Sequence, residues 1–278
     1  MSATKITSTN PAPADFFATP DKRGVFAIDF EKKVVVVTGG NRGLGFGISE
    51  ALLQANASVA IIYNSATDAE EVASKLASKW SQTVKAYQCN VGDAERVKVV
   101  FEQIEQEMGQ IHNVVANSGI SVVKSALDLT ADDFHKVLDV NVLGAFNVSQ
   151  AAARLWIPRK HQGSIVVVSS MSDSIVNAPL TQVFYNTSKG AVSNMTRCLA
   201  SEWAPYNIRV NNLNPGFIKT AQTSGMPQDL RDQQCREVPL GRFSEVWEQA
   251  GQVVFLLSKY ASYQTGASHY VDGGYLVW

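Results

Sequence analysis

Short apolar runs alternate with longer amphipathic stretches from residue 33 almost to the end of the chain. The first run, KVVVVTG at Lys33–Gly39, is β-branched and has no polar alternation, which is typical of a strand buried on both faces. Similar runs predict further strands at 58–63, 84–89, 112–119, 164–170, 207–216 and 268–274. We therefore expect a sheet of about seven strands.

Amphipathic stretches predict a helix after almost every strand. Asp93 is expected to cap a helix that Gly109 ends, and Thr130 a long helix that Pro158 stops near residue 157. Residues 221–240 contain two prolines and are predicted to be irregular. Regular alternation of strand and helix predicts a single α/β domain with a doubly wound parallel sheet. The remaining predicted helices run from the glycine-rich turn to about residue 56 and over about 68–80, 184–204 and 247–258.

Composition and charge limit the classes of partner. Hydrophobic residues make up 45% of the 278 residues and charged residues 18%, which is ordinary for a globular domain with a core. The 24 basic and 25 acidic residues nearly cancel, so no charge field favours nucleic acid or an anionic membrane. No apolar run approaches the ~20 residues that cross a bilayer, and the first residues lack a secretory apolar core. We expect a cytoplasmic location.

The N-terminal residues and the cysteines carry no predicted site. Residues 1–29 are rich in Ser, Thr, Pro and Ala and are predicted to form a flexible arm. Phe16 and Phe17 leave open that the arm packs on the body or on a neighbouring subunit. We expect neither disulfides nor a zinc site, and we assign no metal ion. The three cysteines are widely spaced, with no C-x-x-C pair: Cys89, Cys198 and Cys235.

A glycine-rich turn, TGGNRGLG at Thr38–Gly45, joins the first strand to the first helix. Glycines at 39, 43 and 45 permit a tight turn and let backbone N–H groups approach a pyrophosphate, at which the helix N-terminus also points. In this position after a buried strand, the pattern favours a dinucleotide site. The alternative is a turn that only packs the helix on the strand.

The end of the second strand bears on the choice between NAD and NADP. It reads Tyr63-Asn64-Ser65, without the carboxylate that usually binds the ribose 2′-hydroxyl of NAD. Asn64 and Ser65 can form hydrogen bonds with a 2′-phosphate, and Arg42 can add a charge-assisted one, unless it is only a solvated loop residue. We therefore predict NADP(H) as the cofactor.

The chemistry is predicted to lie beyond the fifth strand. Tyr185 and Lys189 are four residues apart and share one helix face. An ammonium beside the phenol, helped by an oxidised nicotinamide, would lower the pKa of Tyr185 and make it a general acid and base. Ser170 ends the fifth strand and can bind the substrate oxygen, although nearby serines leave the register open. An exposed aromatic–lysine pair is the alternative for Y-x-x-x-K.

Six motifs, in this order, resemble the short-chain dehydrogenase/reductase family. The resemblance covers about residues 30–278 and implies a Rossmann-type domain over that range. Within the family, SSMSDSIVN, YNTSK and YNS are most similar to fungal and yeast enzymes of the mannitol 2-dehydrogenase, sorbose reductase and carbonyl reductase types. The motifs are Thr38–Gly45, ANSG at Ala116–Gly119, VNVLGAF with Asn141, VSS with Ser170, Tyr185–Lys189 and NPGFIKT at Asn214–Thr220.

The resemblance implies a role for each matching residue. Tyr185 would donate the proton, and Lys189 would bind the nicotinamide ribose and lower the pKa of Tyr185. Ser170 would orient the carbonyl, and Asn141 would hold a water molecule that links Lys189 to solvent. Residues 221–240 would form a lid over a substrate pocket with Ser172, Asn177 and Met226. The expected cofactor contacts are Gly39, Asn41, Arg42, Gly43, Leu44, Gly45, Asn64, Ser65, Asn90, Val91, Asn117, Gly119, Tyr185, Lys189, Pro215, Gly216, Ile218 and Thr220.

The chain departs from the family pattern at three positions. Ser118 replaces an alanine, a small change. Asn90 replaces an aspartate, so the adenine contact loses a carboxylate. Asp173 stands where the family usually has glycine, which places a charge either near the mouth of the substrate pocket or in solvent. We expect its side chain to point into solvent.

Together these features predict an NADPH-dependent reductase of a ketone, either a polyol ketone such as fructose or sorbose or a small prochiral ketone. A biosynthetic ketoreductase for a larger secondary metabolite is the second hypothesis. A non-catalytic NADP-binding scaffold is less favoured because all four catalytic residues are present. The family also implies a homotetramer, in which the helix before Pro158 and the helix of Tyr185 pair between subunits, and the apolar end Tyr275–Trp278 fits burial on a neighbour.

Overall fold

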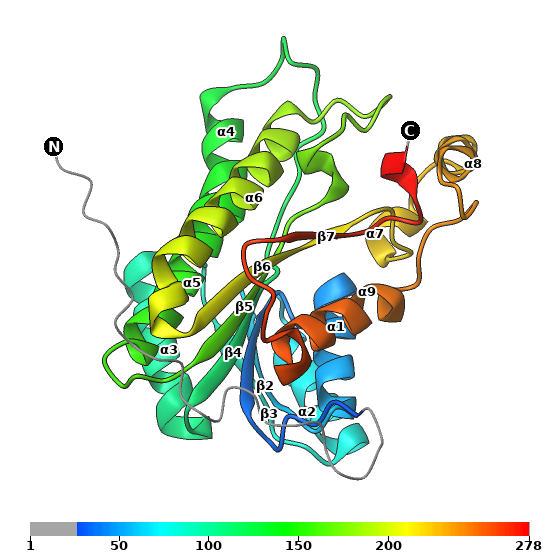
Figure 1. The fold of residues 1–278 in the computed structure, drawn as a ribbon. Coiled ribbons are helices and arrows are strands. Elements are labelled where there is room, and N and C mark those ends of the chain that lie inside the picture. Colours follow the sequence, from blue (N-terminus) through cyan, green and yellow to red (C-terminus); the bar gives the residue numbers. More distant parts are fainter. Residues whose placement is uncertain (1–26, 278) are drawn as a thin grey trace, which may run out of the picture.

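The computed structural model describes residues 27–277, so almost all of the arm predicted at 1–29 lies outside the described residues. The described chain forms one seven-stranded parallel sheet in the order β3-β2-β1-β4-β5-β6-β7 (Figure 1). This order confirms the predicted doubly wound Rossmann-type α/β fold. The strands are β1 (Val34–Thr38), β2 (Ser58–Tyr63), β3 (Val84–Gln88), β4 (Ile111–Ala116), β5 (Gly163–Val168), β6 (Ile208–Pro215) and β7 (Ser268–Val271).

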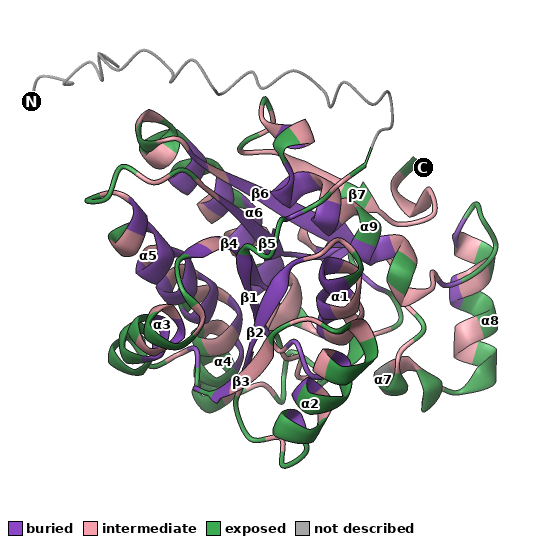
Figure 2. Cartoon of the chain, turned by 90° about the horizontal axis from the view of Figure 1, so that it is seen from below, coloured by how far each residue is buried: buried purple, intermediate pink, exposed green. Residues whose placement is uncertain are grey.

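Helices cover both faces of the sheet, and the buried residues concentrate along the strands and the inner helix faces (Figure 2). One face packs on α3, α5 and α6, and the other on α1, α2 and α9. The helices are α1 (Gly43–Gln54), α2 (Ala69–Trp80), α3 (Ala94–Met108), α4 (Ala131–Leu138), α5 (Gly144–Trp156), α6 (Val183–Trp203), α7 (Ala221–Ser224), α8 (Gln228–Glu237) and α9 (Val246–Leu257).

The valine run of β1 shows why these strands are apolar throughout. Val34 and Val36 pack into the core on the side of α3, α5 and α6, whereas Val35 and Val37 pack on the side of α1 and α9. All four side chains are buried because side chains alternate between faces and both faces are covered.

Two predicted segments differ in the structure. The long helix predicted from Thr130 to residue 157 is divided by a π-helical turn, Asp139–Leu143, between α4 and α5. The prediction that residues 221–240 are irregular is wrong, because they contain α7 and α8. Thr220 and Thr223 form a capping box at the start of α7, and Pro227 immediately precedes α8, where a missing N–H costs no helical hydrogen bond.

The strand order reverses beside β1, where β4 rather than β2 continues the sheet toward β7. In a doubly wound sheet, ligands bind at the carboxyl ends of the strands at such a reversal. The loops after β4 and β5 rise at the top of the molecule in Figure 1, and α7, α8 and the C-terminal turn stand beside them. This edge therefore holds the candidate site.

Candidate active site

The turn after β1 fits closely against the start of α1. Gly39 has φ +64°, a left-handed conformation that favours glycine. A Cβ atom at Gly45 would lie 2.1 Å from the Gly39 carbonyl oxygen, so any side chain there would push α1 off the turn. The two glycines bring the N-terminus of α1 directly onto the turn, where its N–H groups favour a phosphate.

Thr38, the last residue of β1, ties this turn to the loop after β4. Its hydroxyl oxygen accepts hydrogen bonds from the backbone N–H groups of Asn117 and Ser118, both at 2.9 Å. The side-chain amide of Asn117 donates to the Thr38 carbonyl oxygen at 2.8 Å. Thr38 begins the glycine motif, and its structural role is an addition to the residues predicted from the sequence.

The other residues predicted to contact a cofactor lie along the same edge. Arg42, Asn64 and Ser65 are exposed, and the Thr220 methyl carbon is 4.0 Å from the Cβ position of Gly43 across the turn. Val91 is different, because its side chain is buried against Gly144 and leaves only its backbone for a cofactor. The remaining positions are Asn41 and Leu44 after β1, Asn90 after β3, Gly119 after β4, and Pro215, Gly216 and Ile218 at and beyond the end of β6.

Ser170, Tyr185 and Lys189 meet where β5 ends and α6 begins. Ser170 caps the 3-10 turn Met171–Asp173 and forms a hydrogen bond with Tyr185. The Lys189 ammonium group donates to the Val168 carbonyl oxygen at 2.8 Å and lies 5.6 Å from the centroid of the Tyr185 ring. The Ser169 hydroxyl instead donates to the Lys189 carbonyl oxygen. Ser170 is therefore the residue that pairs with Tyr185.

Asn141 lies in the π-helical turn and is almost fully buried. Its side-chain oxygen accepts from the Ile120 N–H group at 2.8 Å, and its amide nitrogen donates to the Ile120 carbonyl and to the Ser188 hydroxyl, each at 2.9 Å. The Cβ position of Gly119 is 3.5 Å from both Asn141 Oδ1 and Lys189 Nζ. Asn141 thus joins the loop after β4 to α6 beside Lys189.

Burial shifts the pKa values of the two titratable residues in opposite directions. Burial raises the pKa of Tyr185, and the hydrogen bond with Ser170 opposes this shift. Burial lowers the pKa of Lys189 to about 8. The net shift of Tyr185 is opposite to the one predicted from its neighbour Lys189, because desolvation of the phenolate is the largest cause. The phenol therefore stays protonated at neutral pH, as a proton donor requires.

A polar array extends from Ser170 through the loop that follows β5. Ser170 donates to the Ser172 hydroxyl at 3.0 Å, and Ser172 donates to Asn177 Oδ1 at 2.6 Å. The same Asn177 oxygen accepts from Gln182 Nε2 at 2.9 Å, and Ser121 donates to Gln182 Oε1 at 3.3 Å. The structure thus brings predicted pocket residues Ser172 and Asn177 together, and adds Gln182 and Ser121.

Met226, the third predicted pocket residue, lies between α7 and α8. Its N–H group donates to the Thr223 carbonyl oxygen at 3.2 Å, which fixes the backbone of this turn. α8 is held beside it by Arg231, which donates to the Thr223 carbonyl at 2.7 Å, and by Tyr275, which donates to Glu237 at 2.8 Å. Among the hydrogen bonds of residues 27–277, none joins Met226 to Ser172 or Asn177, so the structure does not bring it into the array.

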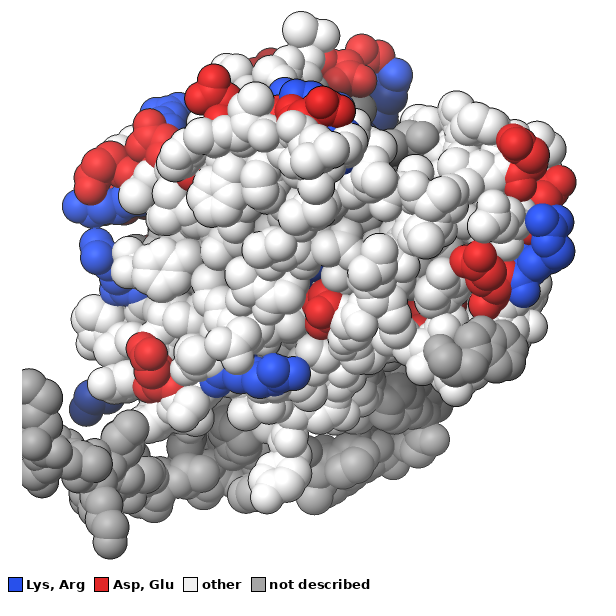
Figure 3. Space-filling model, turned by 90° about the horizontal axis from the view of Figure 1, so that it is seen from above, with Lys and Arg blue, Asp and Glu red and all other residues white. Residues whose placement is uncertain are grey.

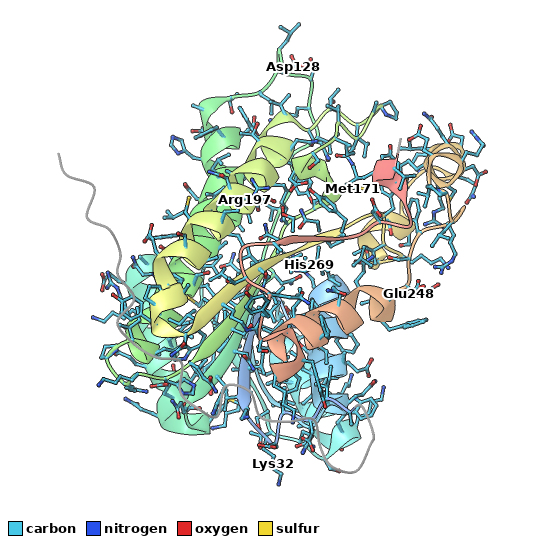
Figure 4. The ribbon with its side chains drawn as sticks, viewed as in Figure 1. Lys32, Asp128, Met171, Arg197, Glu248 and His269 are labelled. Atoms are coloured by element: carbon cyan, nitrogen blue, oxygen red, sulfur yellow. The ribbon has the colours of Figure 1, made fainter. Side chains whose placement is uncertain are left out.

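The prediction that Asp173 points into solvent is wrong. Its carboxylate accepts hydrogen bonds from the side chains of Ser193 at 2.6 Å, Asn214 at 2.9 Å and Tyr270 at 3.0 Å. These donors come from α6, β6 and β7, so the side chain turns inward because three folded elements offer it N–H and O–H groups. Its neighbour Met171 lies near the upper end of α6 in Figure 4.

Residues 27–277 contain neither a membrane-spanning helix nor a cluster of metal-binding side chains. No helix in this part of the chain is long and apolar enough to cross a membrane. Within the same residues, no cluster of three or more His, Cys, Asp or Glu side chains is placed to hold a metal ion. The face seen from above has most of its charged residues toward its borders and mainly uncharged residues in the middle (Figure 3).

Comparison with known proteins adds family relationships to this geometry. Residues 39–276 match the family model described as enoyl-(acyl carrier protein) reductase. The ribulose-forming D-arabinitol 2-dehydrogenase of Candida albicans (strain WO-1) is 39% identical, over 88% of this chain and 93% of the relative. A probable NADP-dependent mannitol dehydrogenase of Yarrowia lipolytica is 34% identical over 98% of each chain. An NADH-dependent L-xylulose reductase of Ambrosiozyma monospora is 36% identical, over 90% of this chain and 97% of the relative.

Solved structures agree with these sequence relationships. A short-chain type dehydrogenase/reductase from Mycobacterium marinum superposes with a TM-score of 0.85 at 32% identity, over 90% of this chain and 97% of the other. The NADPH-dependent 3-quinuclidinone reductase from Rhodotorula rubra gives a TM-score of 0.85 at 33% identity, over 99% and 100% of the two chains. The loop after β5 and the helices α7 and α8 lie within the residues 39–276 that match the family model.

Proposed function

Because this chain belongs to the short-chain dehydrogenase/reductase family of NAD(P)-dependent oxidoreductases, we propose that it reduces a polyol ketone of the fructose or sorbose class with NADPH. The observation that carries the proposal is the polar array that starts at Ser170 and continues through Ser172, Asn177 and Gln182. A ketose carries hydroxyl groups next to its carbonyl carbon, and such an array offers them donors and acceptors. The names of the arabinitol and mannitol dehydrogenases support the same substrate class.

The choice of NADPH rests on the residues that follow β1 and β2. Asn64 and Ser65 are exposed where an NAD-binding site offers a carboxylate, and Arg42 is exposed in the glycine turn. A guanidinium group and two uncharged polar groups favour a 2′-phosphate, which a carboxylate would repel. Relatives named for NADP support this choice, although one relative is named for NADH.

The residues of the site account for the proton side of the reaction. Bound NADPH supplies the hydride to the carbonyl carbon. Ser170 and Tyr185 both bind the carbonyl oxygen, and Tyr185 donates its proton to that oxygen as the C=O group becomes CH–OH. The phenol is protonated at neutral pH and therefore carries the proton that the reduction consumes. Lys189, buried beside the tyrosine ring, binds the nicotinamide ribose.

A homotetramer is part of the proposal. Phe134 and Leu143, on the segment from α4 to α5, are large apolar residues left exposed on this single chain. Pairing of this segment and α6 with the same elements of a second copy would cover them around a two-fold axis. Light scattering at micromolar concentration should give the mass of four chains, and the mass of one chain would contradict the assembly.

A substrate and cofactor panel tests the proposed function. Initial rates of NADPH oxidation are measured with fructose, sorbose, ribulose and an aryl ketone, and each is repeated with NADH. The proposal predicts turnover of at least one ketose, with kcat/KM about tenfold or more higher for NADPH than for NADH. Arg42→Ala should reduce this preference through a higher KM for NADPH and leave the KM for NADH unchanged. Turnover of the aryl ketone alone, or equal use of both cofactors, would contradict it.

A further inference from the structure

The Asp173 carboxylate joins four segments that surround the catalytic serine. Besides its bonds to Ser193, Asn214 and Tyr270, it accepts a hydrogen bond from Ser174 at 2.9 Å. In the sequence, Asn214 is 41 residues away and Tyr270 is 97 residues away.

Asp173 reaches Ser170 by two routes. Its own N–H group donates to the Ser170 carbonyl oxygen at 3.1 Å. The Asn214 amide nitrogen donates both to that carbonyl, at 3.2 Å, and to the Asp173 carboxylate, at 2.9 Å. The backbone of Ser170, and with it the direction of its hydroxyl toward Tyr185, is therefore fixed by donors that Asp173 supplies or orients.

The carboxylate also helps to determine the orientation of the Asn214 side-chain amide. Asn214 is fully buried, and its Nδ2 faces two acceptors, the Ser170 carbonyl and the Asp173 carboxylate. A reversed amide would place Oδ1 against these two oxygens and lose both hydrogen bonds. Asn214 Oδ1 has no partner in the structure, so nothing on its other side holds the amide in place. The orientation is held by the two acceptors of Nδ2, and the Asp173 side-chain oxygen makes the shorter of the two hydrogen bonds.

The same carboxylate is joined to α6 one turn beyond Lys189. Ser193 donates to Asp173 at 2.6 Å and lies 3.0 Å from the Ser169 hydroxyl, which in turn bonds to the Lys189 carbonyl. Asp173 thus connects the loop of Ser170 to the helix that carries Tyr185 and Lys189. The relative position of these two elements is the geometry that proton donation to a bound carbonyl needs.

We propose that Asp173 is a positioning residue that, through its backbone and Asn214, sets Ser170 against Tyr185 for the reduction of the ketone. The inference rests on the proposed function and deepens it. Asp173 itself touches neither of the reacting groups, so its loss should slow the chemical step and leave cofactor binding intact. The Lys189 side chain is not on this route, because its ammonium group donates to the Val168 carbonyl oxygen, and the link through Ser169 and Ser193 reaches only the Lys189 backbone.

Asp173→Ala tests the proposal with the full-length enzyme and the best ketose of the panel. We expect kcat to fall about tenfold to a hundredfold, the cost of a small misplacement, with the Kd for NADPH within about twofold of the wild type. The deuterium isotope effect on kcat with 4-deuterated NADPH should rise, because hydride transfer becomes rate-limiting. An unchanged kcat, or a joint loss of kcat and NADPH affinity without a larger isotope effect, would overturn the proposal.

Two further variants separate positioning from general stability. Asp173→Asn keeps an oxygen for Asn214, and the hydroxyls of Ser193 and Tyr270 can reverse to donate or accept, so kcat should stay within about threefold of the wild type. Tyr270→Phe removes one donor to the same carboxylate without touching the route to Ser170, and it should change kcat by less than about twofold. A loss of kcat in Tyr270→Phe equal to that of Asp173→Ala would contradict the proposed route.

If Asp173→Ala does not fold, Asn214→Ser replaces it, because this variant removes the shared donor and keeps the carboxylate with its other partners. The same loss of kcat and rise in isotope effect are expected, and an unchanged kcat overturns the proposal. If the wild type reduces no ketose, the proposed function fails on its own. Hydrogen exchange of the backbone amides at 170–173 then tests the role of Asp173 without any activity. Faster exchange in Asp173→Ala, or in Asn214→Ser if that variant replaces it, supports positioning, and unchanged exchange contradicts it.

Discussion

The turn at Gly39–Gly45 and the loop at Ser170–Asn177 both lie at the carboxyl edge of the sheet, but they are held there by different means. The glycine turn is fixed by backbone contact, since a Cβ at Gly45 would overlap the Gly39 carbonyl oxygen at 2.1 Å. The serine loop is fixed by side-chain hydrogen bonds, several of them to residues far along the chain, such as Asn214 and Tyr270.

The difference between backbone contact and side-chain hydrogen bonding predicts how each region should respond to amino-acid substitution. Overlap with backbone atoms cannot be relieved by rotating a side chain, so a substitution in the glycine turn should act as an all-or-none change. A network of hydroxyl and amide groups can lose one bond and keep the others, so substitutions around Ser170 should have graded effects. The following predictions test this contrast, from the largest expected effect to the smallest.

Gly45→Ala should abolish cofactor binding. The added methyl group would meet the Gly39 carbonyl and the Asn117 amide nitrogen, at 2.1 and 2.6 Å, and α1 would have to move off the turn. We expect the Kd for NADPH to rise more than about a hundredfold, equivalent to at least ~3 kcal/mol. Fluorescence titration of NADPH measures this change. An affinity within a few-fold of the wild type would show that the turn is not held by backbone fit.

The reduction rate should fall as the pH rises through about 8, the value to which burial lowers the pKa of Lys189. Below this pH the ammonium is charged and can bind the nicotinamide ribose, whereas above it the amine is neutral. We therefore expect kcat/KM to fall by a factor approaching ten for each pH unit above the pKa. A pH profile of kcat/KM measures the limb. Lys189→Arg stays charged and should remove this limb at reduced activity. An unshifted limb in that variant would assign the titration to another group.

Ser172→Ala should have a graded effect on ketose binding. The change removes the hydroxyl between Ser170 and Asn177, while Asn177 Oδ1 keeps its bond from Gln182. Loss of a hydrogen bond of ~1 kcal/mol should raise the KM for the ketose about fivefold and leave the KM for NADPH unchanged. Steady-state kinetics measure both constants, with Ser74→Ala on α2 as a control. A loss of NADPH binding would place Ser172 in the cofactor region instead.

Gly251→Ala should have the smallest effect of the four. It should raise the free energy of unfolding, whereas Gly45→Ala should impair cofactor binding. Gly251 lies within α9, is exposed, and has open space where a Cβ would be added. Alanine should stabilise the helix by about 0.5–1 kcal/mol because glycine loses more backbone entropy on folding. Urea unfolding followed by circular dichroism measures the change. A destabilised variant would mean that α9 is restrained in a way that its open surroundings do not show.

The same contrast explains what could be predicted from the sequence. The strands, their parallel order and the glycine turn depend on local patterns, namely β-branched runs and glycines at short spacing, and the structure confirms this fold. Ser170, Tyr185 and Lys189 were found because they belong to short motifs at the ends of predicted elements. Thr38 and Ser188 lie inside those motifs, yet their bonds to Asn117 and Asn141 connect elements distant in the sequence and could not be predicted from spacing.

The errors concern residues whose partners are distant in the sequence. Asp173 was expected in solvent because a lone acidic residue after a serine gives no sign of donors on β6 and β7. The two prolines in residues 221–240 predict an irregular segment, whereas Pro227 directly precedes α8 and is compatible with it. The pKa of Tyr185 was predicted from its charged neighbour, but burial, which depends on the whole fold, has the larger effect.

The measurement that tests the central claim most directly is single-turnover oxidation of bound NADPH by fructose or sorbose, in the wild type and in Tyr185→Phe. The claim is that the Tyr185 hydroxyl donates the proton that completes reduction of the ketose. We expect the wild type to turn over and the variant to be slower by about a thousandfold, with the Kd for NADPH unchanged. Equal rates in the two proteins would contradict this account, because the proton would then come from another group.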